Sequence, residues 1–198
     1  MPEHDSSMIQ LLEQAMEAMH QTELGGDSLV DGVTREFFTN NYCEAAEGLL
    51  AKTDKLRVVP HGLPAPRRFS FEFDRPFKRR APDGSLELAE GPIRGRIFYR
   101  GDLFSGSHHD RELPAVAVLL DPALAFEHPN VAREEGFVCL GDLPPGPISL
   151  EALLMYLITV LSYANYRCLD PLNRDAARLF ATDPEGALRG LPPMEPLY

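Results

Sequence analysis

Residues 150–161 are the segment that most restricts what this chain can fold into. They read Leu-Glu-Ala-Leu-Leu-Met-Tyr-Leu-Ile-Thr-Val-Leu, which is apolar on nearly every side of a helix. Ser149 stands directly before them as an N-cap residue, and Glu151 places a negative charge in the first turn, where it favours the helix dipole. Because a helix that is apolar all round has to be buried, these residues predict a central helix around which the other elements pack.

Strand patterns precede this helix. Phe69, Phe71 and Phe73 alternate with polar residues, and this period of two is typical of a strand with one buried face. Three further strands are expected near residues 86–88, 93–99 and 116–120, the first of them after a turn at Pro82-Asp83-Gly84. The short connections favour an antiparallel meander of four strands, and residues 59–66, which carry three prolines, are expected to form a connector.

Helices account for most of the remaining chain. One is expected near residues 8–22, a second from about Thr34 to Thr53, and a short one that ends at Phe180 after Asn173 as its N-cap. The proline-rich tail at residues 191–198 is expected to fray. Helices, then strands, then helices indicate an α+β fold. We expect an N-terminal helical extension over residues 1–30 and the main domain over residues 31–198.

The overall charge and the cysteine content exclude several classes of protein. A formal net charge of −11 argues against a nucleic-acid-binding protein, and the basic cluster Lys78-Arg79-Arg80 is interpreted as the solvated end of a hairpin. No apolar run is long enough to span a membrane, and the acidic, polar N-terminus is unlike a secretory signal. Three cysteines, an odd number, argue against a disulfide framework, so we expect a reducing, cytoplasmic location.

A metal site is not expected. The segment His108-His109-Asp110 lies in a polar loop, but two adjacent histidines on extended backbone point in different directions, and no cysteine is nearby. The sequence therefore predicts neither a metal nor another cofactor.

Residues 127–140 are the candidate functional segment. Pro129 and Gly136 interrupt regular structure and predict a loop that holds Asn130 and Cys139 at defined positions. A thiolate is a nucleophile and an amide N–H can donate to a developing oxyanion, so this pair suits acyl transfer. The alternative is a cysteine that only fills space in the core, as most buried cysteines do.

Several motifs follow one another between residues 128 and 177. In order they are His128-Pro129-Asn130-Val131, Gly136-Phe137-Val138-Cys139-Leu140, the apolar helix, Leu161-Ser162-Tyr163-Ala164-Asn165 and Asp170-Pro171-Leu172-Asn173-Arg174-Asp175-Ala176-Ala177. This series resembles that of ubiquitin-conjugating enzymes, and the resemblance covers residues 114–180. It implies the family fold (UBC-like), in which a four-stranded antiparallel sheet is flanked by an N-terminal helix and C-terminal helices.

The resemblance implies an enzyme that carries a ubiquitin-like protein as a thioester. Cys139 would accept the C-terminus of the modifier from an activating enzyme and pass it to an amine, usually a lysine, of a target protein. Asn130 matches the residue that stabilises the oxyanion or orders the loop, and Asp170 matches the acidic residue that orients the lysine and helps to remove its proton. A thioester is already activated, so positioning and an oxyanion donor suffice without a histidine base.

Three further residues, His128, Pro129 and Asn165, match positions that support the active-site loop. A cysteine-protease arrangement, in which His128 would pair with Cys139, is disfavoured because His128 precedes a proline in a tight loop. The chain also departs from the family pattern. Asn130 and Cys139 are nine positions apart, one more than usual, the chain has no tryptophan, and Ala164 replaces a proline.

The resemblance also implies partners and a setting. The partners are a ubiquitin-like modifier, an adenylating activating enzyme and a protein target, without nucleic acid or membrane. The divergence resembles that of bacterial members, which often occur in antiviral operons. The alternative function is an inactive scaffold or binding module of the same fold, which docks the activating enzyme or the modifier, with the N-terminal helices as the docking element.

Overall fold

Several features predicted from the sequence fall on residues that the structure does not describe. The computed structural model describes residues 32–99, 114–120, 126–141, 143, 147–166 and 171–194. The expected helix near residues 8–22, the extension 1–30, the His108-His109-Asp110 segment and Asp170 lie outside the described residues. Among the helices that are described, none has the length and hydrophobicity needed to cross a membrane.

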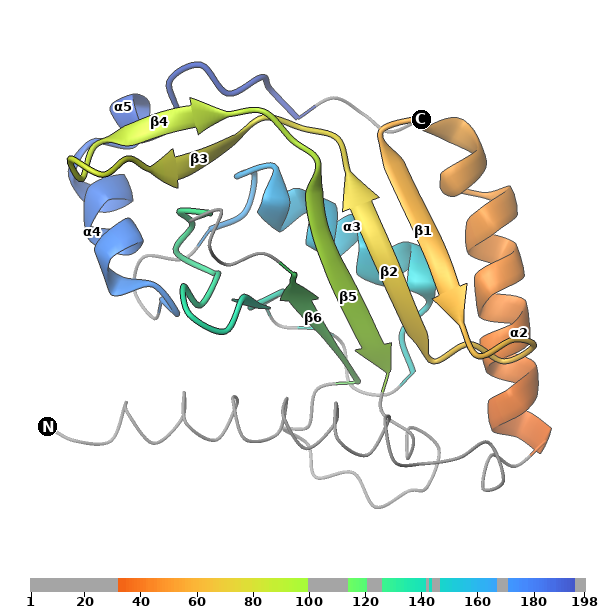
Figure 1. Cartoon of the computed structure of the whole chain (residues 1–198). Coiled ribbons are helices and arrows are strands. Elements are labelled where there is room, and N and C mark those ends of the chain that lie inside the picture. Colours follow the sequence, from red (N-terminus) through yellow and green to blue (C-terminus); the bar gives the residue numbers. More distant parts are fainter. Residues whose placement is uncertain are drawn as a thin grey trace, which may run out of the picture.

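An antiparallel sheet with a helix across one face forms the centre of the molecule (Figure 1). The strand order is β1-β2-β5-β6-β7, with β1 at Leu56–His61, β2 at Arg68–Phe73, β5 at Ile93–Tyr99, β6 at Ala115–Leu119 and β7 at Phe137–Val138. Phe69, Phe71 and Phe73 of β2 are buried and alternate with half-buried polar residues. The period of two therefore correctly predicted a strand with one buried face.

A hairpin stands apart from this sheet. β3 (Phe77–Arg80) and β4 (Leu86–Ala89) pair only with each other within the described sheets, and they lie beside the C-terminal helices (Figure 1). The predicted turn between them is confirmed, and Asp83 accepts hydrogen bonds from the backbone N–H of Ser85 at 2.9 Å and from its hydroxyl at 2.6 Å. An isolated bridge between Arg79 and Phe126 places the hairpin beside the start of the candidate segment, residues 127–140.

The predicted antiparallel arrangement is confirmed, but the strands that form the main sheet differ from the four that were predicted. The strand expected at residues 86–88 is β4, which pairs with β3 outside the main sheet. Part of the expected proline-rich connector belongs to β1. β1 lies at the edge of the described sheet, where Pro60 is tolerated although it lacks an N–H. β7 has only two residues, too few for a periodic signal.

The apolar segment forms α3 (Leu150–Leu161), and it is the predicted central helix. Its buried residues are Leu150, Leu153, Leu154, Leu157, Ile158, Val160 and Leu161. The Ser149 hydroxyl caps it by accepting a hydrogen bond from the Ala152 N–H at 3.1 Å. α2 (Gly32–Glu47) packs beside α3, and a 3-10 turn, η2 (Leu50–Lys52), follows it, so the second helix ends before the predicted Thr53.

The C-terminal part contains α4 (Arg174–Thr182) and α5 (Pro184–Leu188). Asn173 caps α4, as predicted, by accepting a hydrogen bond from the Ala176 N–H at 3.0 Å. The expectation of a frayed tail is wrong for residues 191–194, and residues 195–198 of that tail lie outside the described residues. Leu191 and Met194 pack against the core, and the Arg75 guanidinium donates to the Pro192 carbonyl. These contacts come from segments far away in the sequence, so local composition did not indicate them.

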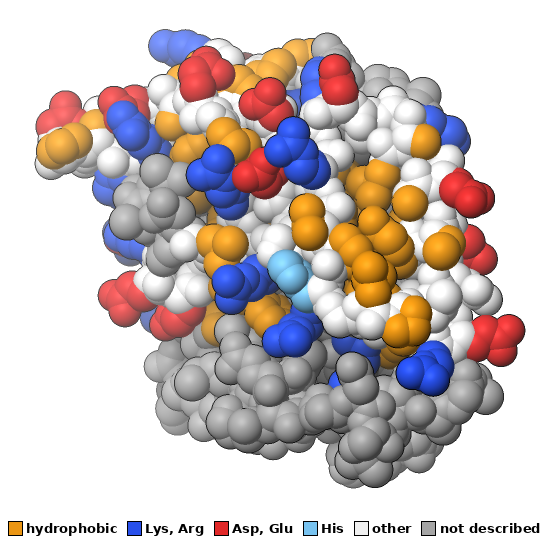
Figure 2. All heavy atoms as spheres, turned by 45° about the vertical axis from the view of Figure 1, so that its right-hand side comes forward, with side chains coloured by type: hydrophobic (Ala, Val, Ile, Leu, Met, Phe, Trp, Pro, Cys, Tyr) orange, Lys and Arg blue, Asp and Glu red, His pale blue; other side chains and the backbone are white. Residues whose placement is uncertain are grey.

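The surface carries charges of both signs. On the face shown in Figure 2, acidic and basic side chains surround a group of hydrophobic ones. The large hydrophobic residues that are exposed in the described part of the chain are Val59, Leu63, Leu88, Leu120 and Tyr156. Although the formal net charge is −11, this face carries basic as well as acidic side chains.

Candidate active site around Cys139

A small hairpin brings Asn130 and Cys139 together. Val131 and Val138 form an antiparallel bridge immediately inside this pair. The turn beyond the bridge contains Gly136, whose φ of +73° lies in the left-handed region that glycine adopts without a steric penalty. The loop predicted from Pro129 and Gly136 is thus a turn closed by backbone pairing, and it presents Cys139 at its end.

Two hydrogen bonds join the two residues. The Cys139 N–H donates to the Asn130 carbonyl at 2.7 Å, and Nδ2 of Asn130 donates to the Cys139 carbonyl at 3.1 Å. Asn130 is only 2% exposed, whereas Cys139 is a partly exposed free thiol. The additional residue between them therefore does not separate them. In this arrangement the Asn130 side chain orders the loop that carries the thiol.

His128 supports the start of the loop from inside the core. Its Nδ1 accepts a hydrogen bond from the Asn130 N–H at 2.9 Å, and its ring centroid lies 4.8 Å from that of Tyr163. Burial lowers the pKa of His128 to about 3, with a small opposing effect of the Val160 carbonyl, although Nε2 makes no hydrogen bond of normal geometry within the described residues. The ring is therefore neutral near pH 7, and the accepting role of Nδ1 assigns its proton to Nε2. The ring thus fixes the position of the Asn130 N–H from inside the core.

Of the other predicted site residues, Pro129 lies in the loop beside Asn130, whereas Asn165 does not. Pro129 is buried, and its carbonyl accepts a hydrogen bond from the Asn173 N–H at 3.0 Å, which ties the loop to the start of α4. Asn165 lies in the turn after α3, where its backbone N–H donates to the Thr159 carbonyl at 3.2 Å. Asp170 lies outside the described residues. The structure thus brings together Cys139, Asn130, His128 and Pro129.

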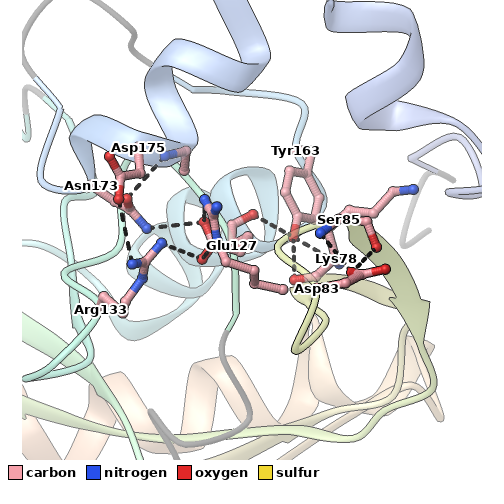
Figure 3. A network of polar contacts seen from close by, with 10 residues as sticks. Lys78, Asp83, Ser85, Glu127, Arg133, Tyr163, Asn173 and Asp175 are labelled. Carbon is pink, nitrogen blue, oxygen red and sulfur yellow. Dashed lines mark hydrogen bonds and ion pairs between the residues drawn. The ribbon is translucent and has the colours of Figure 1, made fainter.

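Glu127 is a buried carboxylate that the sequence patterns did not indicate. Its side chain is 1% exposed and accepts hydrogen bonds from Arg80 Nε at 3.0 Å, Arg133 Nη2 at 2.5 Å and Asn173 Nδ2 at 3.4 Å (Figure 3). A buried carboxylate is tolerated only when it is paired and hydrogen-bonded, and here both conditions are met. In the sequence the only signal is an acidic residue between an aromatic residue and His128.

The cluster Lys78-Arg79-Arg80 is not the solvated hairpin end that the sequence predicted. Lys78 is 4% exposed, and its ammonium donates to the Arg189 carbonyl at 2.6 Å. Burial, and then the charge of Arg189, lowers the pKa of Lys78. The hydrogen bond to Glu127 raises the pKa of Arg80, whose side chain is half-buried. Of the three basic residues, only Arg79 is exposed. The prediction failed because the partners come from distant parts of the chain.

Tyr163 joins the hairpin, the loop and the end of α3. Its hydroxyl donates to the Glu127 carbonyl at 3.1 Å and accepts from the Lys78 N–H at 3.0 Å, and its ring stacks on Phe180 with 5.6 Å between the ring centroids. Burial raises the pKa of Tyr163, so the hydroxyl stays protonated. Its φ of +57° is unusual for a residue other than glycine. This strained backbone is held by the packing and hydrogen bonds around it.

No metal site is evident at this place. Among the described residues, no group of three or more histidine, cysteine, aspartate or glutamate side chains is arranged to hold a metal ion. A cavity of about 420 Å³ lies elsewhere, and Lys55, Arg75 and Ser162 are among its lining residues, whereas Cys139 is not. The candidate site consists of the Cys139 thiol, the Asn130 amide and the residues that hold their loop.

Comparisons with known proteins support the fold. No protein-family model matches the sequence, and no curated protein sequence matches it. Among solved structures, S. cerevisiae Ubc12 is similar with a TM-score of 0.50 and 18% identity, over 91% of this chain and 87% of that one. A Toxoplasma gondii ubiquitin conjugating enzyme, in its E2 domain, matches 74% of this chain and 91% of that one, with a TM-score of 0.43 and 14% identity. The chain has an α+β fold of the UBC-like type.

Proposed function

We propose that this chain is a ubiquitin-like protein conjugating enzyme with Cys139 as its nucleophile. One observation carries the proposal: in a UBC-like fold, the partly exposed thiol of Cys139 lies at the end of a hairpin. The backbone of Cys139 is hydrogen-bonded there to the buried Asn130. The proposed reaction consists of two acyl transfers.

In the first transfer, the Cys139 thiolate attacks the thioester carbonyl that links the modifier to its activating enzyme. A new thioester forms on Cys139, and the thiolate of the activating enzyme leaves. In the second transfer, a target amine attacks this thioester and loses a proton. An amide bond forms, and the Cys139 thiolate is released.

The remaining site residues receive proposed roles. Asn130 orders the loop and donates a hydrogen bond to the oxyanion when the tetrahedral intermediate forms. Asp170 orients the incoming amine and accepts its proton, which a lysine with an ordinary pKa near 10.4 does not release unaided. His128, Pro129 and Asn165 support the loop. The hydrogen bonds of His128 and Pro129 agree with this assignment.

The partners and the setting belong to the proposal as well. The partners are a ubiquitin-like modifier, an adenylating activating enzyme and a protein target, with no nucleic acid or membrane involved. A free nucleophilic thiol fits a reducing compartment, so we place the protein in the cytoplasm. A role in bacterial antiviral defence is supported by the sequence resemblance alone. Neighbouring genes for a modifier and an activating enzyme would support it, and their absence would count against it.

A thioester assay tests the function. The chain is incubated with ATP, a ubiquitin-like modifier and the matching activating enzyme, and the products are separated without reducing agent. We expect an adduct of the chain and the modifier that dithiothreitol cleaves. C139A should form none, and C139S should form an ester that resists dithiothreitol.

The matched control is C43A, because Cys43 is an exposed free thiol on α2. It should load as the wild type does. A dithiothreitol-sensitive adduct that persists in C139A contradicts the assignment. Binding of the activating enzyme without any adduct would instead identify an inactive scaffold, and deletion of residues 1–30 would then show whether the extension does the docking.

A further inference from the structure

The carboxylate of Glu127 connects the two segments between which the reaction would occur. We call residues 128–139 the thiol loop and residues 171–175 the acceptor segment, which follows Asp170 in the chain. Glu127 precedes the thiol loop directly and accepts a hydrogen bond from Nδ2 of Asn173 at 3.4 Å. The Asn173 N–H also donates to the Pro129 carbonyl at 3.0 Å. The two segments are therefore joined at one point of the core.

Arg80 and Arg133 complete this junction, and Arg133 is labelled in Figure 3. Arg80 reaches Glu127 from β3 with both Nε and Nη2, at 3.0 and 3.4 Å. Arg133 belongs to the thiol loop and pairs with Glu127 at 2.5 Å and with Asp175 of the acceptor segment at 3.6 Å. The carboxylate thus holds the thiol loop, the acceptor segment and the hairpin against one another.

Burial makes this arrangement depend on the charge of Glu127. The side chain is 1% exposed, whereas those of Arg80 and Arg133 are 28% and 40% exposed. A neutral residue at position 127 would leave both guanidinium groups without their buried counter-charge, and each could then turn towards solvent. The contacts between Asn130 and Cys139 do not involve Glu127, so they would remain.

We propose that Glu127 is a positioning residue that sets the acceptor segment against the thiol loop, so that it governs transfer of the modifier to the amine more than loading of Cys139. This inference rests on the proposed function and deepens it. Loading requires an accessible thiol, which the Asn130–Cys139 hydrogen bonds hold independently. Transfer also requires the acceptor segment to be correctly positioned against the thiol loop. A displacement of about 1 Å can slow a reaction about a hundredfold.

Single-turnover assays separate the two steps. The chain is loaded, the activating enzyme is stopped by removing ATP, and free lysine is added to discharge the thioester. We expect E127Q to load within about twofold of the wild type and to discharge more than about tenfold more slowly. Since discharge is measured for each loaded molecule, loss of folded protein does not change its rate constant.

The matched control is E72Q. Glu72 also pairs with two arginines, Arg57 at 3.3 Å and Arg94 at 2.9 Å, but on the exposed face of the sheet. The same chemical change there should leave both steps unaltered. E127D restores the carboxylate and should recover part of the discharge rate. R133Q alters a partly exposed residue and should slow discharge in the same direction.

The outcomes distinguish this inference from the function on which it rests. A wild-type chain that forms no adduct overturns the proposed function and the inference together. A wild-type chain that loads, with E127Q discharging at the wild-type rate, overturns only the inference. Equal slowing of loading and discharge in E127Q also overturns it, because Glu127 would then serve the fold as a whole.

Discussion

His128 is a residue whose ionisation is strongly affected by burial. Burial lowers its pKa from 6.5 to about 3, so between these values the unfolded chain binds a proton that the folded chain does not. The contribution of His128 to the free energy of unfolding is therefore largest above pH 6.5 and falls as the pH falls through this window. Between pH 6.5 and about pH 5 the loss should be about 2 kcal/mol.

Urea unfolding at several pH values measures this loss. H128N retains a side-chain acceptor near the Asn130 N–H but has no titrating ring, so its free energy of unfolding should depend less on pH in this window. An equal pH dependence in the wild type and H128N would show that other groups are responsible.

The turn of the thiol loop requires glycine at position 136. A Cβ at position 136 would lie 2.5 Å from the Leu119 carbonyl oxygen, and φ at this position is +73°. The Leu119 N–H also donates to the Gly136 carbonyl at 2.8 Å, so the turn and β6 cannot separate without losing a hydrogen bond. G136A should lower the free energy of unfolding by more than about 2 kcal/mol.

Gly62 provides the matched control for this substitution. It has a φ of +82°, but nothing lies within 4 Å of the position that a Cβ would take there. G62A should therefore cost about 1 kcal/mol, from backbone strain alone. Chemical denaturation of both variants isolates the contact with Leu119, and equal losses would contradict its importance.

In the molecule as a whole, the C-terminal residues close part of the core. Leu191 and Met194 are half-buried and pack against it, beside the Arg75 contact to the Pro192 carbonyl. Truncating both side chains in L191A/M194A should lower the free energy of unfolding by about 2 kcal/mol, since each loses part of its buried apolar surface.

Thermal and chemical denaturation can test this contribution. Pro193, between the two residues, is exposed, so P193A should change the free energy of unfolding by no more than about 0.5 kcal/mol. A double variant as stable as P193A would show that the tail adds nothing to the core.

The sequence by itself determined the features that depend on residues close together in the chain. The apolar segment at residues 150–161 had to be a buried helix, and it is α3. Ser149 and Asn173 cap helices as predicted, because a cap acts on N–H groups only three residues away. The alternation of Phe69, Phe71 and Phe73 likewise specified one buried face of β2.

Tertiary structure alone decided which strands pair and which charges are buried. Glu127 and its partner Arg80 are 47 positions apart, and Lys78 and Arg189 are 111 positions apart. A charged residue looks the same in a sequence whether water or a counter-charge surrounds it. Its burial depends on partners brought together by folding, and so does the pairing of β4 with β3 outside the main sheet. Periodicity reports one segment's own faces, whereas these features depend on contacts between distant segments.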